Sequence, residues 1–267
     1  MSSRALPISP GGERAPAESL HRVELFGSQL LCGSYEQVAD WLIAQARGGT
    51  AAVAAHVNLN NCYELRRWPG GIEKSAQLEL IFDGIGLKLA AWALGQGWVR
   101  DLNGTDLFPI VMQRAAAHGL RVFFLGGRAE IVERAAERAR RDFPGLVVAG
   151  VHHGYFVLDA CDSVVHRVRR ARPDLLVVGM GFPRQEEFAL AQRRRLGARL
   201  IWTAGGLFDF VSGAKPRAPR WLRRLRLEWL YRLWLEPARM WRRNTVPPLW
   251  LAWNVLRWRL RALRRPA

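Results

Sequence analysis

Short apolar runs alternate with longer amphipathic segments between about residues 23 and 203. Apolar runs of five to seven residues predict strands at 51–57, 78–82, 121–125, 146–150, 174–180 and 199–203. Helical periodicity predicts helices at 35–47, 105–119, 129–145, 161–171 and 184–197. Strands that alternate with helices build a parallel sheet covered by helices. We therefore expect an α/β fold, with a mostly parallel, Rossmann-like sheet and flanking helices.

The pattern changes at both ends of the chain. Residues 1–21 are rich in Pro, Gly, Ser and Ala, have no periodicity and lack the apolar run of a signal peptide, which predicts a disordered tail. The alternation of strands and helices stops near residue 213. The predicted organisation is a tail (1–21), an α/β core (22–215) and a C-terminal helical, basic, Trp-rich appendage (216–267).

The appendage has an unusual composition. Residues 217–267 hold 14 arginines against Glu228 and Glu236, which makes +12 of the whole chain's +17, and seven of the 12 tryptophans. Arginine matches the geometry of phosphate, and tryptophan favours a border between apolar and wet surroundings. An anionic phospholipid surface suits both residue types. Nucleic acid is the alternative partner, because interleaved arginines and aromatics also suit phosphate contacts and base stacking.

The end of the appendage has the pattern of a helix that lies in a membrane interface. Five apolar residues fall on one helical stripe and three arginines lie beside it, namely Leu249, Trp253, Leu256, Leu260 and Leu263 with Arg257, Arg261 and Arg264. Leu251 and Trp258 lie off this stripe. No stretch approaches the roughly 20 apolar residues needed to span a bilayer. We expect the appendage to lie on a membrane surface.

Three cysteines are widely separated and form no CxxC motif. Their odd number and spacing predict neither a disulfide framework nor a zinc site, and they favour a reducing, cytosolic location.

Polar and glycine-rich loops follow five of the predicted strands. In an open α/β sheet, ligands bind at the carboxyl ends of the strands, so we expect these loops to converge on one binding edge. The candidate residues there are Asn58, Asn60, Asp83, Gly126, Gly127, Gln185, Glu186, Gly205, Gly206 and Asp209.

Each of these signals also has an ordinary structural explanation. The run LGGRAE lacks the complete GxGxxG of a dinucleotide loop, although a nicotinamide-dependent oxidoreductase remains an alternative function. Asp83-Gly84 is also a common turn, and Asp209 is also placed to cap a helix. The chain has no Asp-x-Asp, so arginine or lysine would have to neutralise a nucleotide diphosphate. No metal site is expected.

Several motifs, taken in order, resemble the WecG/TagA/CpsF glycosyltransferase family over about residues 23–244. They are IFDGIG, NGTDLF, FFLGG, HHGYF, PDLLVVGMGFPRQE, GGLFDFVSG, KPRAPRW and LEWLYRLWLEPARMWRR. The resemblance implies a bacterial enzyme that moves a sugar from a nucleotide diphosphate, with UDP expected, to a saccharide on undecaprenyl diphosphate. It also implies inversion, independence of metal ions and a role in cell-surface or exopolysaccharide synthesis.

The resemblance also implies roles for individual residues. Asp83 is the expected catalytic base, Gln185 is the Gln of the family's PxQE motif, and three appendage arginines are expected to close over the donor diphosphate, namely Arg232, Arg239 and Arg242. Two positions depart from the family, because Asn58 stands where Thr is usual and Asp101 where Arg is usual. Pro237 is expected to kink the appendage helix and to turn its arginines toward the sheet.

The expected partners follow from this reaction. They are a nucleotide-sugar donor, a polyprenyl-diphosphate-linked acceptor and an anionic membrane surface, with no cofactor and no nucleic acid. Assembly into a homo-oligomer is left open. The expected location is the cytoplasm, at the inner face of the plasma membrane.

Overall fold

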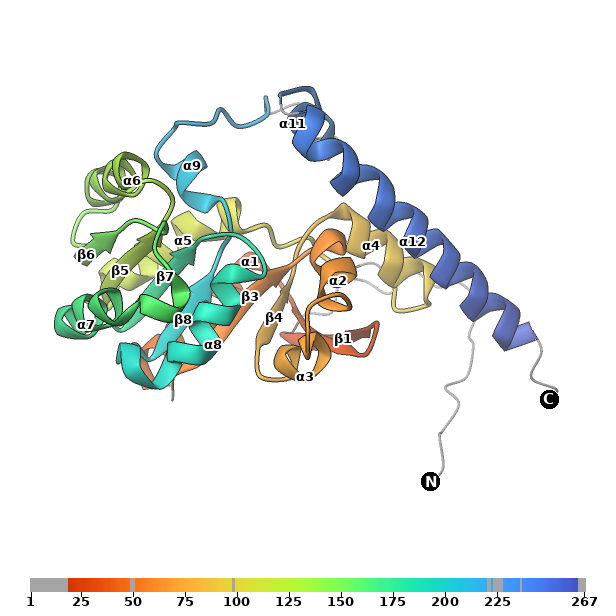
Figure 1. Cartoon of the computed structure of the whole chain (residues 1–267), viewed down its shortest axis with the longest axis horizontal. Coiled ribbons are helices and arrows are strands. Elements are labelled where there is room, and N and C mark those ends of the chain that lie inside the picture. The colour runs from red at the N-terminus through yellow and green to blue at the C-terminus, as the bar shows by residue number, and fades with distance from the viewer. Residues whose placement is uncertain are drawn as a thin grey trace.

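A computed structural model describes residues 19–48, 51–97, 99–219, 222, 228–235 and 237–263. Within these ranges the chain forms an eight-stranded sheet in the order β1-β2-β4-β3-β8-β7-β5-β6 (Figure 1). Neighbouring strands run parallel except β1 and β2. The strands are β1 (His21–Leu25), β2 (Ser28–Cys32), β3 (Ala52–Val57), β4 (Glu79–Phe82), β5 (Arg121–Gly126), β6 (Val147–His152), β7 (Leu175–Gly179) and β8 (Leu200–Thr203). The predicted α/β sheet is confirmed.

The β1–β2 hairpin is not among the predicted elements. Its turn consists of Phe26 and Gly27, with φ angles of 54° and 78°. Two successive positive φ angles give the tight turn whose twist suits a two-residue hairpin. β2 then pairs in parallel with β4, which extends the sheet beyond the predicted strands.

Helices cover both faces of the sheet, because successive residues of each strand point to opposite sides. In β8, Leu200 and Trp202 belong to the core cluster on one side and Ile201 to the cluster on the other. The first face carries α1 (Tyr35–Gly48), α5 (Gly104–Ala117), α6 (Ala129–Asp142) and α9 (Leu207–Val211). The second carries α2 (Leu59–Leu65), α4 (Ile85–Ala93), α7 (Asp162–Ala171) and α8 (Arg184–Leu196), and the short α3 (Gly71–Ser75) and η1 (Leu158–Ala160) complete the core.

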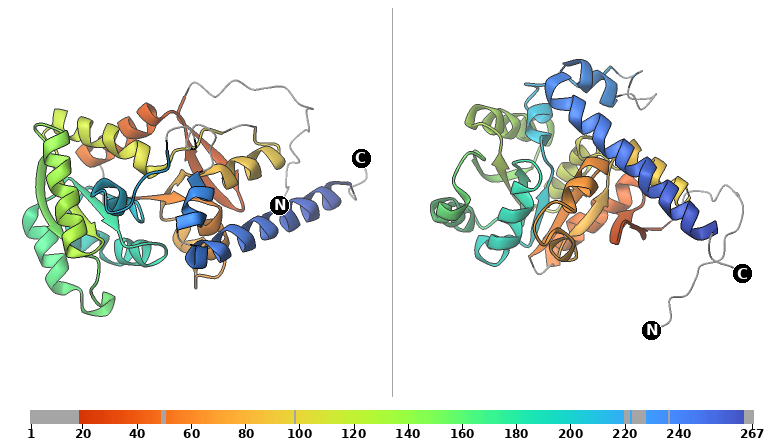
Figure 2. Two further views of the ribbon diagram at one scale, coloured as in Figure 1. Left: turned by 90° about the horizontal axis from the view of Figure 1, so that it is seen from above. Right: turned by 45° about the vertical axis from the view of Figure 1, so that its right-hand side comes forward.

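Within the described ranges, the appendage contains α11 (Glu228–Leu235) and α12 (Pro237–Leu263). Pro237 is the first residue of α12, where its missing N–H costs no helical hydrogen bond. The expected kink inside one helix is therefore wrong, and the proline instead begins a second helix. α12 contacts α2 and α4 and lies along the side of the core (Figures 1 and 2).

α12 docks on the core through a single tryptophan and its neighbours. The ring of Trp250 lies 4.9 Å from that of Phe26 and 5.9 Å from that of Tyr63, and the Arg66 guanidinium lies 5.2 Å from its centroid. Leu251 packs beside Trp250 against the same cluster. The predicted stripe faces elsewhere, because Leu249, Trp253 and Leu256 are exposed. The side chains of Leu260 and Leu263 lie outside the described residues.

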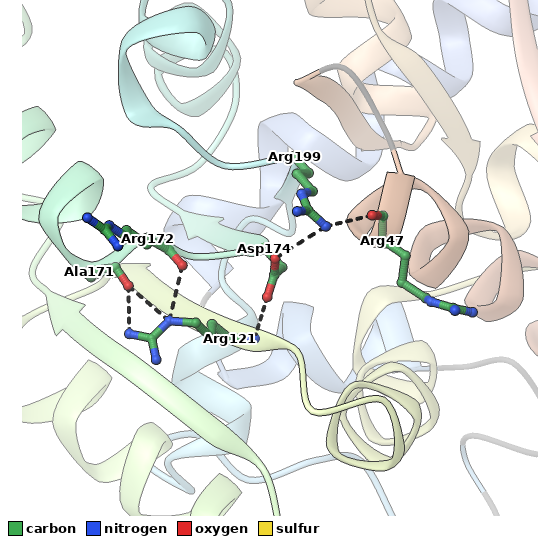
Figure 3. Close-up of polar contacts among 6 residues, drawn as sticks. All are labelled: Arg47, Arg121, Ala171, Arg172, Asp174 and Arg199. Atoms are coloured by element: carbon green, nitrogen blue, oxygen red, sulfur yellow. Dashed lines mark hydrogen bonds and ion pairs between the residues drawn. The ribbon is translucent and has the colours of Figure 1, made fainter.

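Charged groups connect the amino-terminal ends of the central strands (Figure 3). Asp174, which precedes β7, accepts a hydrogen bond from the backbone N–H of Arg121 at 2.9 Å and pairs with Arg199 at 3.7 Å. Arg199 also donates to the carbonyl oxygen of Arg47 at 2.6 Å, and Arg121 donates to that of Ala171 at 2.8 Å. These contacts lie at the amino-terminal ends of the strands, which is the edge opposite to the candidate residues after the carboxyl ends.

The three cysteines are free and buried, in agreement with the prediction of no disulfide framework. Every helix within the described ranges is too short or too polar to cross a bilayer.

Candidate functional site

The predicted site residues follow neighbouring parallel strands. β4, β3, β8, β7 and β5 stand next to one another in the sheet, so their carboxyl ends lie at one edge. The loops after β4, β3 and β8 carry Asp83, Asn58 and Gly205, while Gln185 lies in the first turn of α8, after β7, and Gly126 ends β5. The expected convergence of these loops on one edge is therefore what the topology produces.

Asp83 occupies the turn between β4 and α4. Its backbone N–H donates to the carbonyl oxygen of Val57 at 3.0 Å, which extends the β3–β4 pairing by one residue. Gly84 follows with φ of 92°, a conformation that side chains rarely adopt, and it directly precedes α4. The N–H of Gly84 donates to Oδ1 of Asp101 at 2.6 Å. Asp101 thus holds the Asp83 loop in place.

The charges of three carboxylates act on the hydroxyl of Tyr35. Burial raises the pKa of Tyr35 well above its ordinary value, and the negative charges of Asp106, Asp101 and Asp83 raise it further. The three acids therefore lie within electrostatic reach of one phenol. Neither Tyr35 nor Asp106 was among the predicted site residues.

Asn103 and Arg217 complete this cluster. Asn103 caps α5 by accepting from the N–H of Asp106 at 2.9 Å, and its Nδ2 donates to Tyr35 at 3.1 Å and to Oδ2 of Asp106 at 2.7 Å. Arg217 pairs with Oδ1 of Asp106 at 2.8 Å. The first arginine of the basic segment is therefore anchored to the core beside Asp83. An Asn followed by an Asp three residues later was the sequence signal for this cap.

Asn58 and Asn60 lie on the neighbouring turn after β3. Asn58 caps α2 by accepting from the N–H of Asn61 at 3.1 Å, and Asn60 lies part-buried in the first turn of that helix. Asn61 itself is buried and donates to the carbonyl oxygen of His56 at 3.1 Å. Helix capping accounts for Asn58, and contact of Asn58 or Asn60 with a substrate remains a prediction.

Glycines let three backbones approach closely at the other half of the edge. A Cβ on Gly126 would lie 2.2 Å from the carbonyl oxygen of Gly179, and one on Gly179 would lie 2.8 Å from that of Gly205. Gly127 donates from its N–H to the carbonyl oxygen of Gly179 at 3.0 Å and accepts from Gly154 at 2.9 Å. The loops after β5, β7 and β8 therefore form one compact floor that only glycine permits.

Gln185 holds this floor together from within. Its Oε1 accepts from three backbone N–H groups, those of Met180 at 3.3 Å, Gly181 at 3.1 Å and Gly205 at 3.0 Å. Its Nε2 donates to Oε1 of Glu186 at 2.7 Å. The side chain is 2% exposed, so its polar atoms serve the loops after β7 and β8.

Glu186 is buried beneath the same loops and is 1% exposed. It accepts from the hydroxyl of Thr203 at 2.8 Å, while its Oε2 has no hydrogen-bond partner among the described residues. Burial raises the pKa of Glu186 to about 7. The side chains of Gln185 and Glu186 thus form a buried clamp, and direct contact with a substrate remains a prediction.

Glu186 is expected to make stability depend on pH. The unfolded chain releases this proton near the ordinary carboxyl pKa of 4.5, whereas the folded chain keeps it to about pH 7. Folding therefore takes up a proton in this window, and the free energy of unfolding falls as pH rises from 4.5 to 7 by about 2–3 kcal/mol. In Glu186→Gln this loss should disappear, as urea denaturation at pH 5, 6, 7 and 8 would show. The exposed Glu133→Gln is the control, and equal slopes in Glu186→Gln and wild type would contradict the expectation.

Asp209 and Gly206 belong to the start of α9. Gly206 precedes the helix, and Asp209 in its first turn pairs with Lys215 at 3.2 Å. The N–H of Lys215 also donates to the carbonyl oxygen of Asp209 at 2.9 Å. Asp209 therefore fixes the segment of chain that leads from α9 toward the appendage.

The appendage arginines are described only in part. Arg242 is exposed on α12, and the side chains of Arg232 and Arg239 lie outside the described residues. Among the described residues, no group of three or more His, Cys, Asp and Glu side chains is arranged to hold a metal ion.

Known proteins are similar in sequence to this chain. A relative from Bacillus spizizenii, an N-acetylglucosaminyldiphosphoundecaprenol N-acetyl-beta-D-mannosaminyltransferase, is 37% identical over 166 residues, which cover 62% of this chain and 63% of the relative. A protein of the same description from Staphylococcus aureus is 33% identical over 168 residues, 63% of this chain and 65% of its own length. The chain thus spans less than two thirds of each relative.

The family model named Glycosyl transferase WecG/TagA/CpsF family matches residues 23–265. This match includes the Asp83 loop, the glycine floor, the Gln185–Glu186 clamp and nearly all of the basic appendage. On this evidence the chain belongs to the WecG/TagA/CpsF family of glycosyl transferases.

Proposed function

We propose that this protein transfers an N-acetylhexosaminyl group from a UDP-linked donor to a saccharide carried on undecaprenyl diphosphate. The observation that carries the proposal is the family match over residues 23–265, which includes both the sheet edge and the appendage. The relatives named above are described as transferring N-acetylmannosamine to N-acetylglucosaminyldiphosphoundecaprenol. The product would serve the synthesis of a cell-surface polymer.

Asp83 is the proposed catalytic base. An inverting single displacement requires a base on the acceptor hydroxyl and stabilisation of charge on the departing diphosphate. Asp83 stands at the carboxyl edge of the sheet, in a turn held by Val57 and by Asp101 through Gly84. A rigid turn supports this role because a base must meet the hydroxyl within hydrogen-bond reach.

The leaving diphosphate is assigned to arginines of the appendage. The motif resemblance assigns this role to Arg232, Arg239 and Arg242, and Arg242 is exposed to solvent on α12. Guanidinium groups bind phosphate through paired, charge-assisted hydrogen bonds. Arg217, which pairs with Asp106 of the core, lies in the segment that leads to these arginines.

A membrane-bound acceptor accounts for the appendage's other properties. Its 14 arginines and seven tryptophans suit the headgroup level of an anionic bilayer, where the diphosphate of a polyprenyl carrier lies. An apolar hollow of about 580 Å³ also lies between its helices, lined by Leu222, Leu230, Tyr231, Leu233, Trp234 and Pro237. We therefore place the protein on the inner face of the plasma membrane.

The proposed reaction is tested by the release of nucleotide. The purified full-length protein would be incubated with vesicles that contain undecaprenyl diphosphate N-acetylglucosamine and with a panel of UDP-sugars. Release of UDP that depends on both substrates, with a disaccharide-lipid product of inverted anomeric configuration, is the expected result. Hydrolysis without acceptor, or no release with any donor, would contradict the proposed function.

Chelation of metal ions is expected to leave the rate unchanged. The sequence has no Asp-x-Asp to hold a metal between protein and diphosphate, and the proposal gives that role to Arg232, Arg239 and Arg242. Initial rates would be compared with and without EDTA. Loss of activity that magnesium or manganese restores would assign the neutralisation to a metal ion and overturn this part of the proposal.

A further inference from the structure

Helix α4 exposes apolar side chains although it belongs to the core. One side of the helix is fully buried through Leu87, Ala90 and Ala91. On its other side, Leu89 is 47% exposed and Trp92 is 56% exposed. An isolated exposed apolar residue needs no explanation, but an exposed patch that joins another marks an interaction site.

A second exposed apolar stripe lies on the neighbouring α12. Leu249, Trp253 and Leu256 are 71%, 59% and 50% exposed, and Val246 continues the stripe. This stripe is not what attaches α12 to the core, because Trp250 and Leu251 make that contact. α12 contacts α4 and runs alongside it in Figure 1, so the two helices that carry these exposed residues are neighbours. We call the six residues Leu89, Trp92, Val246, Leu249, Trp253 and Leu256 the α4–α12 surface.

The charges of these helices favour an anionic partner. Neither α4 nor α12 contains Asp or Glu. Arg242 and Arg257 are exposed on α12, and the Arg257 guanidinium lies 5.9 Å from the Trp253 ring centroid. Leucines offer nothing for a nucleic-acid base to stack on, whereas they insert readily between lipid chains. An anionic bilayer therefore fits the α4–α12 surface better than nucleic acid.

We propose that α4 docks on an anionic membrane together with α12, so that the catalytic core itself, and not only the appendage, contacts lipid. α4 begins two residues after Asp83. With a rise of about 1.5 Å per residue, Trp92 lies about 10 Å along the helix from its first residue. Docking of α4 would hold the Asp83 loop near the headgroup level, where a polyprenyl diphosphate presents its sugar. Only this last consequence rests on the proposed function.

Substitution of the two exposed α4 residues tests the proposal in the full-length protein. Leu89→Gln/Trp92→Gln removes apolar surface without changing charge. The matched control is Tyr155→Gln/Val157→Gln, which replaces an aromatic and an aliphatic residue that are 71% and 67% exposed between β6 and η1, at the other end of the sheet. Binding would be measured by co-sedimentation with vesicles of phosphatidylglycerol and phosphatidylcholine, and thermal unfolding would check the fold of both variants.

The α4 variant is expected to bind these vesicles at least tenfold more weakly than the control variant, since each apolar side chain loses its transfer into lipid. Transfer to a short water-soluble acceptor should be unchanged, while KM for a vesicle-borne acceptor rises. Equal binding by the two variants would overturn the proposal. Weaker binding to a single-stranded oligonucleotide with unchanged vesicle binding would overturn it too, in favour of nucleic acid. A wild type that transfers no sugar would contradict the proposed function alone, because vesicle binding is measured separately.

Discussion

Asp83→Asn is expected to lower the rate of transfer by about 10²- to 10⁴-fold, the usual cost of losing a general base. The amide has nearly the same shape as the carboxylate, and the backbone contacts of the turn do not depend on it. The N–H of residue 83 still reaches Val57, and Gly84 still reaches Asp101. Donor affinity and thermal stability should therefore change little. Single-turnover kinetics with saturating donor would isolate the chemical step.

Two further substitutions distinguish the catalytic role of Asp83 from the roles of other acidic residues. Asp101→Asn keeps an oxygen that accepts from Gly84, so it should cost less activity than Asp83→Asn. Asp142→Asn lies at the end of α6, where Asp142 forms an exposed pair with Arg141, and should leave the rate unchanged. A larger loss in Asp101→Asn than in Asp83→Asn would move the role of base to Asp101. Near-full turnover by Asp83→Asn would remove it from the mechanism.

Removal of the appendage is expected to abolish transfer while leaving a folded α/β core. Truncation after Pro219 preserves the Arg217–Asp106 pair, which joins this segment to the core, and the buried Ala218. It deletes 13 arginines and two glutamates, a net charge of +11. Attraction to anionic lipid of about 1 kcal/mol per basic residue near the surface should be lost with them. Vesicle binding should then fall to the weak binding that the exposed residues of α4 provide.

The truncated core also tests whether the appendage takes part in catalysis. A short water-soluble acceptor removes the need for membrane contact, yet turnover should remain absent because Arg232, Arg239 and Arg242 are missing. The truncation removes Trp250 and so exposes Phe26, Tyr63 and Arg66, which contact it in the full chain. A second truncated variant with Tyr63→Ser would reduce this newly exposed aromatic surface and improve solubility. Circular dichroism and a cooperative thermal transition would establish that the core is folded. Turnover of the soluble acceptor at the full-length rate would make the appendage an anchor only.

The sequence predicted the central strands well because they are buried on both sides. β3, β4, β5, β7 and β8 read as continuous apolar runs, and each leads directly into a polar or glycine-rich loop. The edge hairpin escaped prediction because β1 and β2 are short and contain polar residues such as Arg22, Glu24 and Gln29. Its turn also has Phe26 at a positive φ, where Gly, Asn or Asp would be the usual signal.

Motif order alone was enough to identify the family, since eight short motifs in one order are far more specific than any single pattern. The convergence of the loops also follows from sequence, because parallel strands bring their carboxyl ends to one edge. The apolar stripe predicted on α12 is exposed where it is described, at Leu249, Trp253 and Leu256, and its contact with a membrane stays a prediction. Composition alone determined the strong positive charge of the appendage.

Only the tertiary structure decided which side chains meet. It joined Tyr35 and Asp106 through Asn103, although Tyr35 and Asp106 are 71 positions apart, within electrostatic reach of Asp83 and Asp101. It placed Gln185 and Glu186 in the interior, where they bond to loops distant in sequence, and it set α12 against α4. Periodicity reports which face of an element is apolar, whereas the neighbour that covers or exposes that face depends on long-range packing. The sequence therefore determined the central strands, their order along the chain and the family, and the fold determined the neighbours of Tyr35, the buried clamp and the α4–α12 surface.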